Sequence, residues 1–337
     1  MDAAMKPLTL LGLGLALSAG PAGAESPSRH VLPTAIAYPE GVAYDARARV
    51  FYVAGSTTAF IARVDARTSR ATVVKAPAVA AQIGDAFPGV LGLHLDPRGR
   101  LWMAGGRTGK AFVVNPASGA LIQTVTPPDA AQGLINDIAF AEGKAYLTDT
   151  LRPILWMADA GARVLAAPQA WLNFDGTALE YAPGANLNGI VATADGKTLI
   201  AGQMNKGLLF KIDIASRKVT PIDLKGQTVE GVDGLVLRGR TLYVIRQPAA
   251  EIVTVALAPD LASGRVVSRK AVDGLLWPAT GALAGDELLV VNTQFNRRPT
   301  GDAEMPFSVQ RVPLADLAGV VSTYPFVGSK HRIGDPP

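Results

Sequence analysis

The chain of 337 residues contains no cysteine, and it is poor in histidine and in charged residues. Without cysteine it can form no disulfide, no thiolate metal site and no cysteine nucleophile. It has three histidines, too few to favour a Ser-His-Asp triad. Charged residues make up 18% and hydrophobic residues 49% of the chain, a balance that excludes a disordered chain and a coiled coil.

Long apolar runs are also missing, apart from a short one near the start. Lys6 precedes an apolar stretch from Leu8 to Leu17, and the small residues Ala22-Gly23-Ala24 follow it. This order is typical of a secretory signal peptide, so we predict that residues 1–24 are cleaved and that the mature chain begins at Glu25. The apolar stretch is shorter than the roughly 20 residues that span a bilayer. We therefore expect an exported protein, periplasmic or secreted, with no membrane partner.

The net charge of +4 arises from lysines and arginines that are scattered along the chain. Nucleic-acid binding needs a basic cluster or stripe, so we expect no nucleic-acid partner.

Turn-forming residues, in contrast, are abundant, with 35 Gly and 24 Pro. The sequence also contains a repeat. Six segments begin with one residue that is usually polar and usually followed by Gly, and each continues into a short strand pattern. The first residues are Glu40, Leu91, Asn136, Asn188, Asp233 and Thr280, at intervals of 51, 45, 52, 45 and 47 residues. This spacing matches the roughly 40–50-residue period of four-stranded propeller blades.

The predicted fold is therefore an all-β, six-bladed β-propeller of four-stranded blades. The last unit shows three strands, so we expect the segment 29–37 to supply its fourth strand and close the ring. A single propeller domain over residues 25–328 and a loose tail over residues 329–337 are predicted, and we expect a monomer.

The first residues of the six units form a ring, because the innermost strand of each blade lines the central channel. Glu40, Asn136, Asn188 and Asp233 are oxygen donors, two carboxylates and two amides. Such a set suits Ca²⁺, with Mg²⁺ or Mn²⁺ as alternatives. Zn²⁺ is possible but less favoured, since no His or Cys belongs to the ring. The alternative interpretation is that Asn-Gly and Asp-Gly simply form turns.

The phrases around these residues resemble the metal-site motifs of the senescence-marker-protein/gluconolactonase/luciferin-regenerating-enzyme superfamily. They are Pro39-Glu40-Gly41-Val42, Ile135-Asn136-Asp137-Ile138, Leu187-Asn188-Gly189-Ile190 and Val232-Asp233-Gly234-Leu235. The sequence of residues 148–153 is most similar to that of an exported bacterial branch of this superfamily. The resemblance implies one central divalent metal held by Glu40, Asn188 and Asp233, with Asn136 as a direct or water-mediated ligand. It also implies that Asp233 is the catalytic carboxylate.

Two departures from the family pattern limit the expected number of metal ions and the expected substrate. Sugar-lactone members carry an Arg where this chain has Leu134. Members with a second, structural calcium carry a His and an Asp where this chain has Thr280 and Val236. We therefore expect one metal ion, and a substrate other than a sugar lactone.

Polar residues also gather where the second strand of each blade returns to the channel mouth. A mouth of this kind suits a small anionic or oxygen-rich substrate. The predicted substrate-binding residues are Arg107, Asp149, Arg152, Asn205, Arg246, Gln247, Asn292 and Thr280. His94, in contrast, is interpreted as a packed residue between blades.

Two function classes remain open. The first is a metal-dependent hydrolase of a lactone or another ester, in which the cation polarises the acyl oxygen and Asp233 is the base or nucleophile. The second is a non-catalytic exported propeller that binds a small ligand or a protein partner, with a structural metal.

Overall fold

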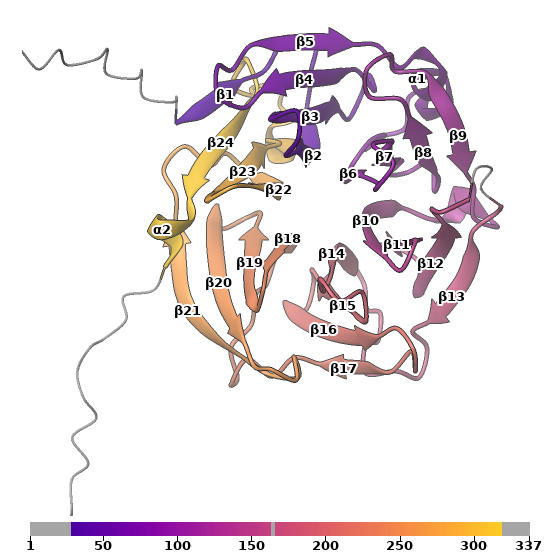
Figure 1. The fold of residues 1–337 in the computed structure, drawn as a ribbon, viewed down its shortest axis with the longest axis vertical. Helices are drawn as coiled ribbons and strands as arrows, with labels where there is room; N and C mark the ends of the chain where they lie inside the picture. The colour runs from indigo at the N-terminus through magenta and orange to yellow at the C-terminus, as the bar shows by residue number, and fades with distance from the viewer. Residues whose placement is uncertain (1–27, 163–165, 319–337) are drawn as a thin grey trace, which may run out of the picture.

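A computed structural model describes residues 28–162 and 166–318, and it contains six four-stranded sheets. Viewed along the channel, the sheets stand around a common centre like blades (Figure 1). The predicted all-β, six-bladed architecture is confirmed. The predicted signal peptide, residues 1–24, and the predicted tail, residues 329–337, lie outside the described residues, as do the two ends of the predicted domain.

Each of the first five blades is a meander in which consecutive strands pair antiparallel, from the channel outwards. Blade one holds β2 (Pro39–Asp45), β3 (Val50–Gly55), β4 (Ile61–Asp65) and β5 (Ala71–Val74). Blade two holds β6 (Leu93–Leu95), β7 (Leu101–Ala104), β8 (Ala111–Val114) and β9 (Leu121–Val125). Blade three holds β10 (Ile135–Ala141), β11 (Lys144–Asp149), β12 (Ile154–Asp159) and β13 (Gln169–Asn173).

The remaining blades repeat this order. Blade four holds β14 (Leu187–Ala192), β15 (Thr198–Gln203), β16 (Leu208–Asp213) and β17 (Val219–Pro221). Blade five holds β18 (Val232–Arg238), β19 (Thr241–Arg246), β20 (Glu251–Leu257) and β21 (Gly264–Ala271). Blade six holds β22 (Pro278–Ala284), β23 (Glu287–Asn292), β24 (Ser308–Pro313) and β1 (Arg29–Val31).

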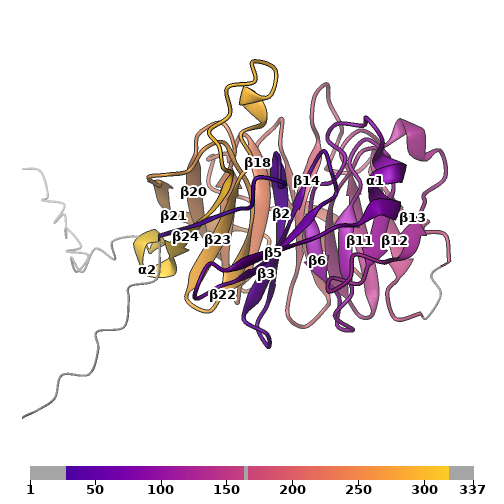
Figure 2. The same cartoon turned by 90° about the horizontal axis from the view of Figure 1, so that it is seen from above.

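Helices among the described residues are short and belong to the connections. They are α1 (Pro77–Ile83), α2 (Leu314–Leu317) and the 3₁₀ turns η1 (Ala130–Gln132) and η2 (Phe295–Arg297). None of them is long and apolar enough to cross a membrane. Seen from the side, the loop that carries η2, coloured gold, stands out from one end of the ring (Figure 2).

The core consists of the layers between neighbouring blades. Large side chains such as Phe51, Trp102, Tyr146 and Phe210 are almost completely buried in these layers. Burial of this kind contributes about 25 cal/mol for each Å² of apolar surface removed from water. Because each layer joins two blades, the stability of the ring depends on all six layers.

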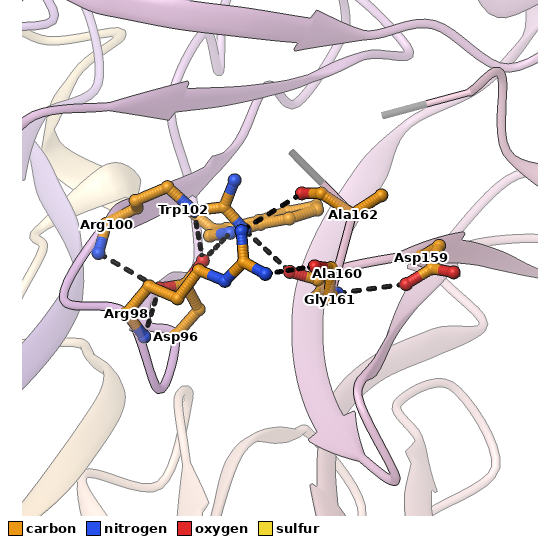
Figure 3. A network of polar contacts seen from close by, with 8 residues as sticks. All are labelled: Asp96, Arg98, Arg100, Trp102, Asp159, Ala160, Gly161 and Ala162. Atoms are coloured by element: carbon orange, nitrogen blue, oxygen red, sulfur yellow. Dashed lines mark hydrogen bonds and ion pairs between the residues drawn. The ribbon is translucent and has the colours of Figure 1, made fainter. Parts of the chain in front are cut away.

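Polar clamps add to the packing between blades two and three (Figure 3). Arg100 donates from Nε to Asp96 at 2.6 Å and from its other end to the carbonyl of Ala160 at 2.7 Å. Trp102 donates to the same Asp96 carboxylate at 3.0 Å. Arg98 reaches the carbonyl of Gly161. Asp96 is 4% exposed, so this buried carboxylate is satisfied by the hairpin that it organises.

The ring closes as predicted, because the N-terminal strand β1 pairs with β24 in the register Arg29 to Gln310, His30 to Val309 and Val31 to Ser308. His30 is completely buried there, with Nδ1 hydrogen-bonded to Ser69 Oγ at 2.7 Å and its ring 4.9 Å from that of Phe51. Burial, aided by Arg311, lowers the pKa of His30 to about 4. Closure of the ring therefore depends on a neutral imidazole.

We expect the closing strand to make the protein sensitive to acid. A lowered folded-state pKa means that the unfolded chain binds the proton first, so stability is full above pH 6.5 and is lost as the pH falls towards 4. The loss amounts to about 1.4 kcal/mol per pH unit and about 3 kcal/mol in total. Chemical unfolding of wild type and His30→Gln at pH 7.5 and 4.5 measures it. Equal losses of stability in the two proteins would contradict the assignment.

Candidate metal centre in the channel

The ring of predicted ligands rests on a bulge that recurs in the innermost strands. In β2, β10, β14 and β18 the register with the second strand shifts across two residues. A bulge of this kind re-aims side chains at the rim of a sheet. The bulge pairs are Glu40-Gly41, Asn136-Asp137, Asn188-Gly189 and Asp233-Gly234. The structure therefore places the four predicted ligands at equivalent positions.

In blade six the bulge lies one residue earlier in the sequence than the repeat predicted. Pro278 pairs with Asn292 and Gly281 with Val290, so the bulge falls on Ala279 and Thr280. Ala279 thus occupies the ring position, and Thr280 occupies the position that is Gly in four other blades. A Cβ built on Gly234 would lie 2.5 Å from the Cα of Thr280. Thr280 therefore contacts the neighbouring blade, and its predicted place in the ring is wrong because strand pairing, not the Thr-Gly dipeptide, sets the bulge.

The two ring carboxylates are buried and partly unpaired. Glu40 and Asp233 are each 3% exposed, and Glu40 Oε2 and Asp233 Oδ1 have no hydrogen-bond partner among the described residues. Burial, the charge of Asp233 and that of Asp137 hold the pKa of Glu40 well above its usual range. Burial and the charge of Asp137 raise the pKa of Asp233 to about 7, opposed by a hydrogen bond with Asn188. Both shifts show that negative charge is crowded and poorly solvated in the channel.

The ring fits a hard cation. Asn136 Oδ1 is a third buried oxygen without a partner among the described residues. Unpaired buried oxygens of this kind are costly unless something compensates them, and a divalent cation with oxygen ligands would do so. The described residues contain no cluster of three or more His, Asp or Glu side chains in metal-binding geometry. A cation here would therefore depend on the two amides as well as on the two carboxylates.

Sequence reasoning missed Asp137, which stands where four other blades have Gly. Its carboxylate accepts hydrogen bonds from His94 Nε2 at 2.6 Å and from the backbone of Ile190 at 3.0 Å. A Cβ on Gly92 would lie 2.4 Å from Asp137 Oδ1, so only glycine in blade two leaves room for this carboxylate. His94 is thus the partner of a buried acid and not merely a packed residue. The Asn-Asp dipeptide, as a break in the X-Gly pattern, was the available signal.

Most predicted substrate-binding residues at the mouth hold the fold together. In four blades the last residue of the second strand ties down the loop that enters the first strand. Asp149 accepts from the backbone of Leu134, and Arg246 donates to the carbonyl of Glu230. Asn292 donates to the carbonyl of Gly274, and Gln203 donates to that of Glu180. These side chains are therefore engaged within the blades.

The other predicted mouth residues divide into two kinds. Asn205 donates to the carbonyl of Pro183 and to Asn186, so it belongs to a loop of blade four. Gln247 is buried and Arg107 is exposed, and neither side chain hydrogen-bonds to another described residue. Of the predicted cations, Arg107 is the one that remains available to a ligand.

Arg152 is held by the fold rather than presented to solvent. Its Nε donates to Asp149 at 2.7 Å, its NH1 donates to the carbonyls of Pro128 and Asp129, and the guanidinium lies 4.9 Å from the ring of Trp156. Asp149 is fully buried and also accepts from Trp156. The pair is therefore part of the framework of blade three.

We accordingly expect Arg152→Ala to lower the free energy of unfolding by about 3 kcal/mol, because it leaves a buried carboxylate without its cation. Arg47, exposed and without a side-chain partner among the described residues, supplies the control variant Arg47→Ala. Urea unfolding of both variants measures the effect. A loss of no more than that of Arg47→Ala would refute a structural role for Arg152.

Comparisons with known proteins agree with the fold. Residues 23–150 match the model of the SMP-30/Gluconolactonase/LRE-like region. A search of curated protein sequences found no match. Among solved structures, the Malassezia sympodialis allergen Mala s 1 is 15% identical with a TM-score of 0.63, and the alignment covers 85% of this chain and 95% of that one.

Two further solved structures are similar. The calcium-binding protein regucalcin from Agrobacterium tumefaciens is 17% identical with a TM-score of 0.58, covering 86% of this chain and 95% of that one. The periplasmic gluconolactonase of Pseudomonas aeruginosa is 17% identical with a TM-score of 0.52, covering 82% of this chain and 86% of that one. At such identities the structural similarity establishes the fold alone. The chain is thus a six-bladed β-propeller, and its residues 23–150 match the model of the SMP-30/Gluconolactonase/LRE-like region.

Proposed function

We propose that the protein is a divalent-cation-dependent hydrolase of a lactone or another ester. The observation that carries this proposal is the ring of buried oxygens in the channel, three of them without a hydrogen-bond partner among the described residues. The match of residues 23–150 to the lactonase-containing family supports it. Glu40, Asn136, Asn188 and Asp233 would hold the cation, with Ca²⁺ as the best fit to an oxygen-only set.

A cation bound there would supply a Lewis acid for the acyl oxygen of the ester. The residues of the chain would do the rest. Asp233, with its raised pKa, would accept the proton of the attacking water at a carboxylate oxygen. Glu40 would share the charge of the site without facing bulk solvent, since it is 3% exposed. Arg107, exposed and without a partner among the described residues, would attract an anionic or oxygen-rich substrate.

The proposal includes export to the periplasm or beyond, action as a monomer and the absence of nucleic-acid or membrane partners. The proposed export is supported by the apolar segment of residues 8–17 and by the small-residue cleavage signal that follows it.

A non-catalytic binding propeller is the second candidate, and one observation favours it. Asp149, Arg152, Arg246 and Asn292 are engaged in hydrogen bonds of the fold, which leaves few polar groups at the mouth to orient a substrate.

Hydrolysis assays separate the two candidates. The purified chain, loaded with Ca²⁺, is tested on γ- and δ-lactones and on aryl acetates, then retested with excess chelator and after Ca²⁺ is restored. We expect turnover that the chelator abolishes and Ca²⁺ recovers. If the metal-loaded protein hydrolyses none of these esters, the binding propeller is the better account.

A further inference from the structure

The half of the channel beyond the ring contains a separate cavity. Its volume is about 360 Å³, within the range of small-molecule sites. All six innermost strands contribute to its wall, at residues in their second halves, so it opens towards the turns that join the first and second strands. The cavity is therefore distinct from the ring of predicted metal ligands.

The side chains that line this cavity are apolar, with two exceptions. Aliphatic side chains, Phe140 and backbone form most of the wall, and His94 and Tyr44 are the only polar side chains among the described residues that line it. No Lys, Arg, Asp or Glu takes part in this described lining. A charged ligand would lose its hydration there without a counter-charge, so the chemistry of the wall selects a neutral ligand.

His94 is fixed in place for such a ligand. Its Nε2 is bonded to Asp137 Oδ1 at 2.6 Å, and Asp137 is itself 4% exposed and anchored by the backbone of Ile190. The His94 side chain remains 32% exposed. No described residue hydrogen-bonds Nδ1, and Nδ1 is not among the buried atoms without a partner. One ring nitrogen is thus committed to the protein and the other is left to a ligand.

We propose that this cavity binds a neutral, apolar molecule that carries one hydroxyl group, an alcohol or a phenol, with the hydroxyl on His94 Nδ1. A hydroxyl both donates and accepts, so it pairs with Nδ1 in either protonation state of the imidazole. The apolar part of the ligand would pack against the aliphatic side chains of the wall, much as benzene binds in an engineered apolar cavity of about 150 Å³. The site does not require the metal ring or any hydrolase activity.

The absence of cysteine from the chain allows a direct test, because one introduced cysteine is a unique reporter. Ala192 lines the cavity and Ser118 lies on an exposed turn, so Ala192→Cys is the reporter and Ser118→Cys is the control. The probe is 4-ethylphenol, compared with 4-ethylanisole, in which the O–H is capped, and with 4-ethylbenzoate, which is charged. Thiol labelling rates and calorimetric titration of each probe are measured.

We expect 4-ethylphenol to slow the labelling of Ala192→Cys saturably and to leave Ser118→Cys unchanged. His94→Phe, which keeps the bulk of the ring and removes its nitrogens, should weaken the binding of 4-ethylphenol about tenfold, the upper range for one hydrogen bond. The two control probes should bind at least several-fold more weakly than 4-ethylphenol.

Three results would each overturn the proposal: no saturable binding of 4-ethylphenol to the wild type, equal binding by the capped probe, or equal binding by a folded His94→Phe. Should His94→Phe fail to fold, His94→Gln replaces it, and undiminished binding by that variant would have the same force.

Discussion

Removing divalent cations at pH 8 is expected to lower the melting temperature by roughly 6 °C. A ligand that binds only the native state, at 1,000 times its Kd, adds about 4 kcal/mol, and with about 2.1 cal/mol/K of unfolding entropy per residue each kcal/mol shifts the melting temperature of a chain of 337 residues by roughly 1.5 °C. The channel supplies a second reason, since Glu40 and Asp233 are buried and their charges repel. The cation would relieve both the repulsion and the unpaired oxygens.

The same shifts give this effect a pH dependence of known sign. The folded-state pKa values of Glu40 and Asp233 are raised, so the folded, metal-free protein binds protons more tightly than the unfolded chain. The stability that these two groups contribute to the metal-free protein is present below pH 4, and the part due to Asp233 is lost as the pH rises through about 7. Since Ca²⁺ competes with those protons, the stabilisation by Ca²⁺ should be small at pH 5 and full at pH 8.

Calorimetric melting in Ca²⁺ and in chelator, at both pH values, measures this prediction. Asp233→Asn should melt higher than wild type in chelator at pH 8 and respond weakly to Ca²⁺. Asp175→Asn, at an exposed position, is the matched control and should behave as wild type. Identical melting of the wild type in Ca²⁺ and in chelator at pH 8 would exclude the ring as a cation site.

Asp233→Asn is also expected to reduce turnover by about 10²-fold or more, on any ester that the wild type hydrolyses. The change keeps the shape and one oxygen ligand but removes the basic oxygen, and general base catalysis is worth about 10²–10⁴-fold. Arg107→Ala supplies the contrast. Its exposed cation would contribute to binding of substrate and transition state alike, so the variant should raise KM and leave kcat nearly constant.

Metal content must be measured beside the rates, because Asp233 is both a proposed ligand and the proposed base. A variant that retains Ca²⁺ at high Ca²⁺ concentration but loses turnover supports the catalytic role. Full turnover by metal-loaded Asp233→Asn would remove Asp233 from the mechanism while leaving the metal site in place.

Much of the architecture was predictable because it is periodic. The intervals of 45 to 52 residues between the first residues indicated six blades of four strands, and the six four-stranded sheets confirm this number. Outer strands were harder to predict. The fourth strand of blade three, Gln169–Asn173, was not predicted, because a short edge strand exposed at three of five residues has little hydrophobic alternation.

The sequence alone determined which residue types recur at blade spacing, and therefore the blade number, the closing strand and the four ring oxygens at Glu40, Asn136, Asn188 and Asp233. Only the tertiary structure decided what those residues meet. It placed Ala279 instead of Thr280 in the ring, because pairing with β23 sets the bulge. It also showed that Asp149 and Arg152 hydrogen-bond to the protein instead of facing a ligand, since their partners Leu134 and Pro128 lie in a loop that precedes them by 15 and 24 residues. The contact between Asp137 and His94, 43 residues apart, exists because two blades approach across Gly92, and no local pattern encodes that approach.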